Sequence, residues 1–366
     1  MALSTLLPDE TLTPVDTKKA KLVQTINPVE EIHAVQPELI KSSYPEVLSS
    51  ESHSDFRDEL ARNGFAVVKG AIPPERAAHY REKAKDWLLS FGGKLDFENR
   101  ETWTDENLPS QNVIRTFASY CVAHEKFMWD ARQETGVLDA FSRLWGTDKL
   151  LVSFDSLNVT FPNRLDVPRR QPWEHIDQSP LKRGVHCVQG IINLSPSGPE
   201  DGGLVVYPRS HRYNDELFDS MSVEDKQSWL PLKDIYFFKK EQLDWFHERG
   251  VKAHKVCAEP GDLILWDSRT IHYGSDPMDS SSQIRTAIYA AYTPASMASP
   301  DQLALKKQVF EKYGGTTHWP HDHIVVRNSH VMLPDGSRDP RDRDEPLEMP
   351  EKSDQLLRLA GVKAYD

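Results

Sequence analysis

The sequence of 366 residues is short of three things, and each shortage excludes a class of protein. No run approaches the ~18 consecutive apolar residues that a membrane-spanning helix needs. Cysteine is scarce: Cys121, Cys187 and Cys257 are widely spaced and odd in number, so we expect buried, reduced thiols rather than a disulfide framework or a zinc ribbon. Basic residues are outnumbered, since 44 Lys and Arg face 56 Asp and Glu, and the formal charge of −12 argues against a general nucleic-acid binder.

Several sequence motifs are missing as well. There is no Gly-x-Ser-x-Gly elbow, no Walker loop and no Gly-x-Gly-x-x-Gly turn, so hydrolase, nucleotide-hydrolysing and dinucleotide-binding classes have little support. The first residues lack the features of a secretory signal or a mitochondrial presequence, and the last three are not a peroxisomal signal. We therefore expect a cytoplasmic protein that binds neither membrane nor nucleic acid. The sequence does not indicate an oligomeric state.

The pattern along the chain predicts three parts. Residues 1–50 are polar and rich in proline, which indicates a flexible or surface-wrapped arm. Residues 51–298 should form the main domain, whose segment 54–147 is expected to be helical support, with helices over 54–64, 72–91 and most of 113–147 and a strand from Phe65. Residues 299–366 should form a C-terminal extension of helices and loops.

Residues 148–294 have a different texture. Short β runs alternate with turns rich in Gly and Pro, which favours a β-sandwich or barrel. Segment 214–250 interrupts the β pattern with aromatic and charged residues and is predicted to be a helical insertion that covers a pocket mouth. The fold class is therefore mainly β with helical support on the N- and C-terminal sides.

The chemistry points to a metal. His175 and Asp177 alternate along an extended segment and should share a face, and His272 ends a later β run. Two histidines and one carboxylate with open coordination positions suit non-haem Fe(II). Arg285 follows on an apolar strand and offers a bidentate fork for a carboxylate. A second copy of the motif at His53 and Asp55 begins a helix and is better explained as a helix cap.

Several further residues are candidates for the pocket, and each has a simpler structural explanation. Gln189 and Asn193 lie on one face of the strand after the motif and could touch co-substrate or substrate, or form a polar core. Ser275 could donate to a co-substrate carboxylate or merely close a turn, and Trp173 could wall the pocket or pack in the core. The histidines within 318–323 favour packing or substrate contact over a second metal site.

Basic residues surround the His175 motif. They are either solvated loop charge or a cationic rim that attracts acidic small molecules, which slightly favours an anionic substrate. The set comprises Arg164, Arg169, Arg170, Lys182 and Arg183.

Four segments, in order, resemble the phytanoyl-CoA dioxygenase (PhyH-like) superfamily of Fe(II)/2-oxoglutarate-dependent oxygenases. They are Phe56–Glu75, similar to its helix-strand-helix; Trp173–Asp177, similar to its iron motif; Gly198–His211, similar to its glycine-rich turn; and Gly261–Arg285, similar to its distal ligand and 2-oxoglutarate arginine. The chain departs from the family where Arg209 replaces the usual glycine and where extra loop separates His272 from Arg285.

The resemblance implies a double-stranded β-helix, a cupin-like jelly roll. It implies Fe²⁺ held by His175, Asp177 and His272, with 2-oxoglutarate and O₂ as co-substrates and the far carboxylate of 2-oxoglutarate on Arg285. Ser275 and Gln189 are further candidates for co-substrate contact from their own positions, although the extra loop after His272 weakens the case for Ser275. The expected reaction oxidises a C–H bond of a small molecule and releases succinate and CO₂. Hydroxylation is the default outcome, and the presence of Asp177 leaves halide no obvious place.

Two other functions remain open from the residues alone. A metal-dependent cupin with lyase or isomerase chemistry would use the same ligands without Arg285 as a clamp and would consume no O₂. A non-catalytic binding protein on the same fold would have no need for all four residues. The substrate pocket residues with least support are Trp173, Asn193 and Arg183.

Overall fold

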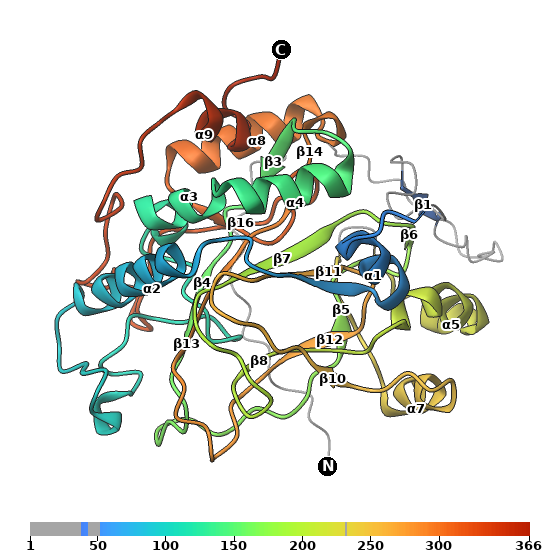
Figure 1. The fold of residues 1–366 in the computed structure, drawn as a ribbon, viewed down its shortest axis with the longest axis horizontal. Coiled ribbons are helices and arrows are strands. Elements are labelled where there is room, and N and C mark those ends of the chain that lie inside the picture. Colours follow the sequence, from blue (N-terminus) through green and yellow to red (C-terminus); the bar gives the residue numbers. More distant parts are fainter. Residues whose placement is uncertain (1–37, 43–51, 231–232) are drawn as a thin grey trace, which may run out of the picture. The chain divides into compact units, whose positions relative to one another are not determined.

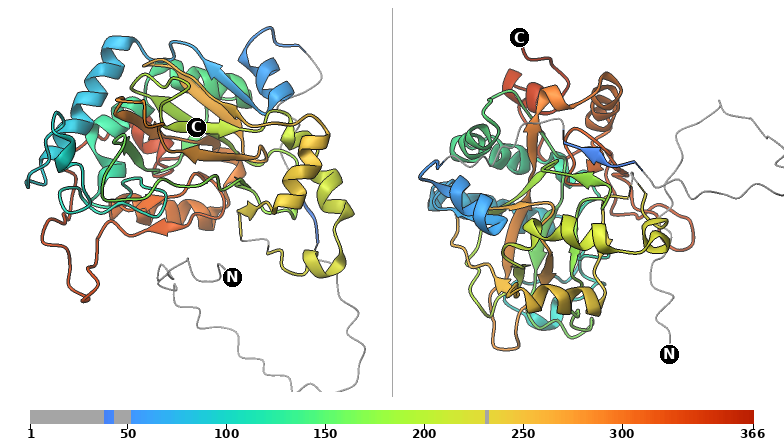
Figure 2. Two further views of the ribbon diagram at one scale, coloured as in Figure 1. Left: turned by 90° about the horizontal axis from the view of Figure 1, so that it is seen from below. Right: turned by 90° about the vertical axis from the view of Figure 1, so that its right-hand side faces the viewer.

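The structure is a computed structural model that describes residues 38–42, 52–230 and 233–366. Of the predicted N-terminal arm, only 38–42 lies within these residues, where β1 (Ile40–Lys41) pairs in parallel with β6 (Lys182–Arg183). The described residues belong to one compact unit (Figures 1 and 2). None of the described helices is long and apolar enough to cross a bilayer.

Two five-stranded antiparallel sheets form the centre of this unit (Figure 1). The larger sheet has the order β2 (Phe65–Val68), β11 (Leu263–Asp267), β7 (Val188–Asn193), β13 (Arg285–Tyr289) and β4 (Leu157–Thr160). The smaller sheet has the order β10 (His254–Lys255), β8 (Gly203–Val206), β12 (His272–Ser275), β5 (His175–Ile176) and β9 (Tyr236–Phe237).

The two sheets face each other across a shared apolar core. Ile191, Ile264 and Trp266 of the larger sheet pack there with Leu204 and Val206 of the smaller one. Because side chains alternate along a strand, residues 189 and 191 of β7 point into this space while residues 188 and 192 point to the other face. The predicted double-stranded β-helix is confirmed.

Helices cover the outer face of the larger sheet, and most of them gather on one side of the strands in Figure 1. The apolar stripe predicted for 72–91 packs there, with Trp87 and Leu88 buried. The helices are α1 (Phe56–Asn63), α2 (Pro74–Leu89), α3 (Lys126–Arg132), α4 (Thr135–Trp145), α8 (Pro300–Glu311) and α9 (Asp354–Leu359). Short pairs β3 (Leu150–Val152) with β14 (Tyr292–Pro294) and β15 (Gly315–Thr316) with β16 (Val326–Arg327) lie outside the two main sheets.

Three local expectations are corrected. The predicted helical stretch 113–147 becomes helical only near Val122, because Phe117 exchanges both backbone hydrogen bonds with Leu157. Insertion 214–250 contains α5 (Asn214–Ser220), α6 (Val223–Lys226) and α7 (Lys240–Glu248), but it also supplies β9, which pairs with β5. All three cysteines are free thiols, yet Cys257 is exposed rather than buried.

The turn that carries Arg209 ties α1 to the segment before His272. Arg209 donates its N–H to the Asn63 carbonyl (2.8 Å), and the N–H of Ile271 donates to Ser210 Oγ (2.8 Å). Gly64 fits here because its φ is +79° and an added Cβ would lie 2.3 Å from Thr270 Oγ1. The segment that delivers His272 is thus clamped to the first helix.

Arg209 itself has a φ of +72°, a left-handed conformation that costs a residue with a Cβ roughly 1–2 kcal/mol. We expect the free energy of unfolding of Arg209→Gly to exceed that of Arg209→Ala by about 1 kcal/mol, so that the glycine variant is the more stable. Both variants lose the same side-chain contact with the Gly250 carbonyl, so their difference isolates the backbone conformation. Urea denaturation of the pair measures it, and equal stability would show that the turn stores no strain.

Candidate active site

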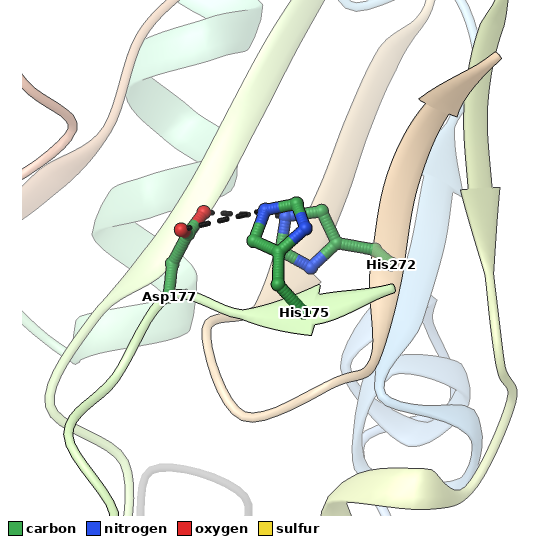
Figure 3. A group of neighbouring side chains, drawn as sticks. All are labelled: His175, Asp177 and His272. Carbon is green, nitrogen blue, oxygen red and sulfur yellow. Dashed lines mark ion pairs between the residues drawn. The ribbon is translucent and has the colours of Figure 1, made fainter. Parts of the chain in front are cut away.

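Strand pairing brings the two predicted histidine ligands together. His175 on β5 lies directly opposite His272 on β12 in the antiparallel register, and Asp177 follows β5 with its backbone N–H bonded to the Ser268 carbonyl (3.0 Å). One ligand atom from each residue lies within 4.8 Å of the others, and no other such group of metal-ligating side chains occurs in the described part of the chain. Figure 3 shows the carboxylate facing the two rings.

Backbone carbonyls fix the orientation of both rings. Nδ1 of His175 lies 3.0 Å from the Trp173 carbonyl, and Nδ1 of His272 lies 2.9 Å from the Thr270 carbonyl. A proton on each Nδ1 therefore serves as a donor, and each Nε2 keeps its lone pair. The two Nε2 atoms lie 3.5 Å and 3.2 Å from oxygens of Asp177. Such an arrangement leaves three donor atoms pointing at one position.

Charge at the three residues suits a divalent cation. Burial, helped by His272, lowers the pKa of His175 to about 4, so this ring is neutral at physiological pH. Burial tends to raise the pKa of Asp177, but His175 and its neighbours more than offset this and hold the pKa below its usual range. Neutral imidazole nitrogen and a carboxylate on one side of the position, with the opposite side open to a cavity, are the donor set of non-haem iron.

Gln189 supports the carboxylate. Its Nε2 donates to Asp177 Oδ2 (2.9 Å) and lies 3.4 Å from Ser268 Oγ. It lines the same cavity as the ligands, as predicted from its strand position, but its amide is engaged by Asp177 rather than directed to a free co-substrate. Trp173 also lines the cavity, and its indole stacks on the His175 ring with centroids 4.2 Å apart and an interplanar angle of 10°.

Arg285 lies in the same cavity, which has a volume of about 450 Å³. Its side chain is held by Asn158, whose Oδ1 accepts from Arg285 Nη1 (2.6 Å) and from Thr160 Oγ1 (3.0 Å). No acidic side chain forms an ion pair with Arg285 among the described residues, so its charge is free for an incoming anion. Ser275 lies nearby, but its hydroxyl donates to the Gly203 carbonyl (3.1 Å).

Two predicted pocket residues lie elsewhere. The Asn193 amide donates to the carbonyls of Ser195, Ala258 and Glu259. It therefore holds the loops that contain these residues and does not line the cavity. Arg183 likewise does not line the cavity.

The predicted cationic rim is corrected too, because carboxylates pair with all five of its members. The pairs are Arg164 with Asp105 and Asp166, Arg169 with Asp279, Arg170 with Asp276, Lys182 with Asp234 and Asp322, and Arg183 with Asp215 and Asp219. The rim therefore gives no support to an anionic substrate.

The C-terminal extension forms part of the cavity wall, in keeping with the packing or substrate-contact role predicted for the histidines within 318–323. His318, Trp319 and His323 line the cavity with Val325 and Arg327. The dense histidine and aromatic content of 318–323 was the available signal, and it marks a wall rather than a second metal site. Asn158 was missed, although Asn158 and Thr160 alternate as polar residues in a buried strand.

Comparison with known proteins places the chain in a family. The family model for phytanoyl-CoA dioxygenase matches residues 60–287. The Ava biosynthesis cluster protein O of Aspergillus versicolor is 40% identical over 273 residues, which cover 74% of this chain and 87% of that protein. Among solved structures, the GlcNAc-inducible gene 2 product of Candida albicans has a TM-score of 0.54 at 12% identity, covering 87% of this chain and 78% of that one. A hypothetical protein of Escherichia coli has a TM-score of 0.53 at 17% identity, covering 78% and 79%.

The two solved structures show a shared fold. A jelly roll that presents two histidines and a carboxylate beside a buried arginine defines a non-haem iron, 2-oxoglutarate-dependent oxygenase. Within that class, the chain belongs to the phytanoyl-CoA dioxygenase family.

The hydrogen bond from Gln189 to Asp177 should strengthen the binding of Fe(II), and this can be tested. Gln189→Met keeps the volume but removes the donor to Asp177 Oδ2, so we expect Fe(II) to bind roughly 10-fold to 100-fold more weakly. Competition with a chromophoric chelator under anaerobic conditions measures this. Ser268→Ala is the matched control, because it removes the other partner of the same amide, and it should change affinity by about 2-fold or less. Equal affinities for Gln189→Met and wild type would contradict the assignment.

Proposed function

We propose that His175, Asp177 and His272 hold Fe(II) and that Arg285 binds the distal carboxylate of 2-oxoglutarate. The observation that carries this proposal is the cavity that contains the three converging ligand atoms and an arginine without an acidic partner. Bound iron would supply O₂ activation coupled to oxidative decarboxylation of 2-oxoglutarate to succinate and CO₂. The oxidation of the substrate is proposed to be hydroxylation of a C–H bond.

The protein's own residues would orient the reactants and shield them. Thr270 and Trp173 hold the histidine rings through their carbonyls, and Gln189 keeps Asp177 turned toward the metal position. Asn158 directs the guanidinium of Arg285 into the cavity. These contacts exist before any ligand binds, so little reorganisation is needed when the co-substrate enters.

The proposed substrate is a small, largely neutral molecule. The wall beyond the ligands combines apolar and aromatic side chains from four segments, among them Trp173, Ile235, Tyr289 and Trp319. Among the charged residues of this wall, Arg170 and Arg327 are paired with Asp276 and Asp155, and Lys233 is exposed to solvent. The name of the Aspergillus relative refers to a biosynthesis cluster, which supports a biosynthetic intermediate as the substrate.

Anaerobic spectroscopy tests the proposed function. Fe(II) and then 2-oxoglutarate added to wild-type protein should produce a visible metal-to-ligand charge-transfer band. His272→Ala should abolish the band because it removes a ligand, whereas exposed His79→Ala should leave it intact. Arg285→Ala should still form the band but require about 10-fold to 100-fold more 2-oxoglutarate, as expected for loss of a charge-assisted contact.

A folded, iron-loaded protein that gives no band at any 2-oxoglutarate concentration would contradict the proposal. The weight would then move to a metal cupin that acts as a lyase or isomerase, since that chemistry needs the three ligands without the dicarboxylate clamp. A protein that binds no iron at all would instead favour a binding function. Oxygen uptake that depends on 2-oxoglutarate separates the oxygenase from both.

A further inference from the structure

A second buried cation lies beside Arg285. Nζ of Lys255, on β10, is shielded from solvent and has no hydrogen-bond partner among the described residues, and the same is true of Arg285 Nε. Other buried ammonium groups are satisfied: Lys182 is paired with Asp234, and Lys306 donates to the Val152 carbonyl. A buried ammonium without a partner is costly, so its retention beside a second cation calls for an explanation.

Glycine at position 203 lets these groups converge. Gly203 lines the cavity and has a φ of +149°, a conformation that favours glycine. The position of its absent Cβ is 2.7 Å from Lys255 Nζ, 3.0 Å from Ser197 Oγ and 3.4 Å from Arg285 Nε. Lys255, Ser197 and Arg285 come from three different segments and surround one point, where a side chain would otherwise intrude. Gly203 and Arg285 line the cavity itself, whereas Lys255 and Ser197 are not lining residues and approach it only at Gly203.

The electrostatic environment favours an anion at this point. Burial and then the charge of Arg285 lower the pKa of Lys255 to about 7. Asp201 is the nearby acid, but its carboxylate already accepts from the Gly198 N–H (2.8 Å) and from Ser281 Oγ (2.6 Å). A carboxylate that entered from the cavity would give both cations the partner that the protein does not supply.

We propose that Lys255 is a second cationic ligand for the distal carboxylate of 2-oxoglutarate and clamps it together with Arg285 across Gly203. The proposal rests on the proposed function, because it names the same co-substrate. It adds a residue from β10 to the co-substrate site. Binding then takes up a proton whenever Lys255 is neutral in the free protein, since the carboxylate requires the ammonium form.

Titration with two keto acids tests the role of Lys255. In the charge-transfer assay, Lys255→Met should raise the Kd for 2-oxoglutarate about 10-fold to 100-fold. It should leave the Kd for 2-oxovalerate, which has the same keto-acid end but no distal carboxylate, within about 2-fold of wild type. Lys255→Arg, which keeps the charge, should recover most of the affinity. A purely structural role would weaken both keto acids equally.

The pH dependence of binding gives an independent readout. The wild-type Kd for 2-oxoglutarate should rise between about pH 7 and 8.5, because deprotonated Lys255 must regain its proton to bind. The other charged or titratable groups that act on it are Arg285, Asp201 and Cys257, of which arginine keeps its charge throughout. The profile should be flat in Lys255→Met and in Lys255→Arg.

The outcomes separate the two proposals. Absence of a band in wild type with either keto acid overturns the proposed function and this inference together. A normal wild-type band with equal 2-oxoglutarate affinity in Lys255→Met overturns only the role of Lys255. Thermal unfolding guards against misfolding: Lys255→Met should melt at or above the wild-type temperature, because it removes an unpaired buried ammonium.

Discussion

The antiparallel register between β5 and β12 is the constraint on which the site depends. It places His175 opposite His272, yet β5 has only two residues and could not hold that register alone. Insertion 214–250 solves the problem by adding β9 on the far side of β5, where His175 pairs with Phe237. Behind it, Ile176 packs with Phe218 and Phe246 of the same insertion. The insertion therefore fixes His175, a proposed metal ligand, in addition to contributing Asp234 and Ile235 to the cavity wall.

The protein is acidic, with a formal charge of −12, yet one end of the cavity should attract anions. The arginines and lysines around the His175 motif are matched with carboxylates, so they contribute little field to the cavity. Arg285 has only the neutral amide oxygen of Asn158 as a partner, and Lys255 has none among the described residues. Under the proposed function, a dicarboxylate would be attracted to this end of the cavity, and its keto-acid end would then be directed toward the metal position.

Local patterns predicted the parts of the structure that depend on neighbours in sequence. The Asn63-Gly64 stop, the apolar stripe of α2 and the alternation of His175 with Asp177 are all signals of this kind. Partners distant in sequence decided the rest. Asn193 lies on the same strand face as Gln189, as the alternation of side chains predicted. Its amide, however, is hydrogen-bonded to the carbonyls of Ala258 and Glu259 and does not line the cavity. Lys255 gave no signal, because only the fold brings β10 beside β8 and so beside Arg285.

The chemistry and the choice of substrate reside in different parts of the chain. The family model ends at residue 287, so it includes the three ligands and Arg285 but omits the wall segment 317–327. Membership of the phytanoyl-CoA dioxygenase family therefore does not imply that this chain acts on phytanoyl-CoA, because part of the wall lies outside the family match. The two parts are nevertheless joined at Lys182, five residues after Asp177. Its buried ammonium contacts Asp234 of the insertion and Asp322 of the C-terminal extension, and it lies 4.0 Å from the centre of the Trp319 ring. One cation ties the segment that carries His175 and Asp177 to both wall segments. We therefore expect a change of the wall that removes this contact to shift His175 and Asp177 as well.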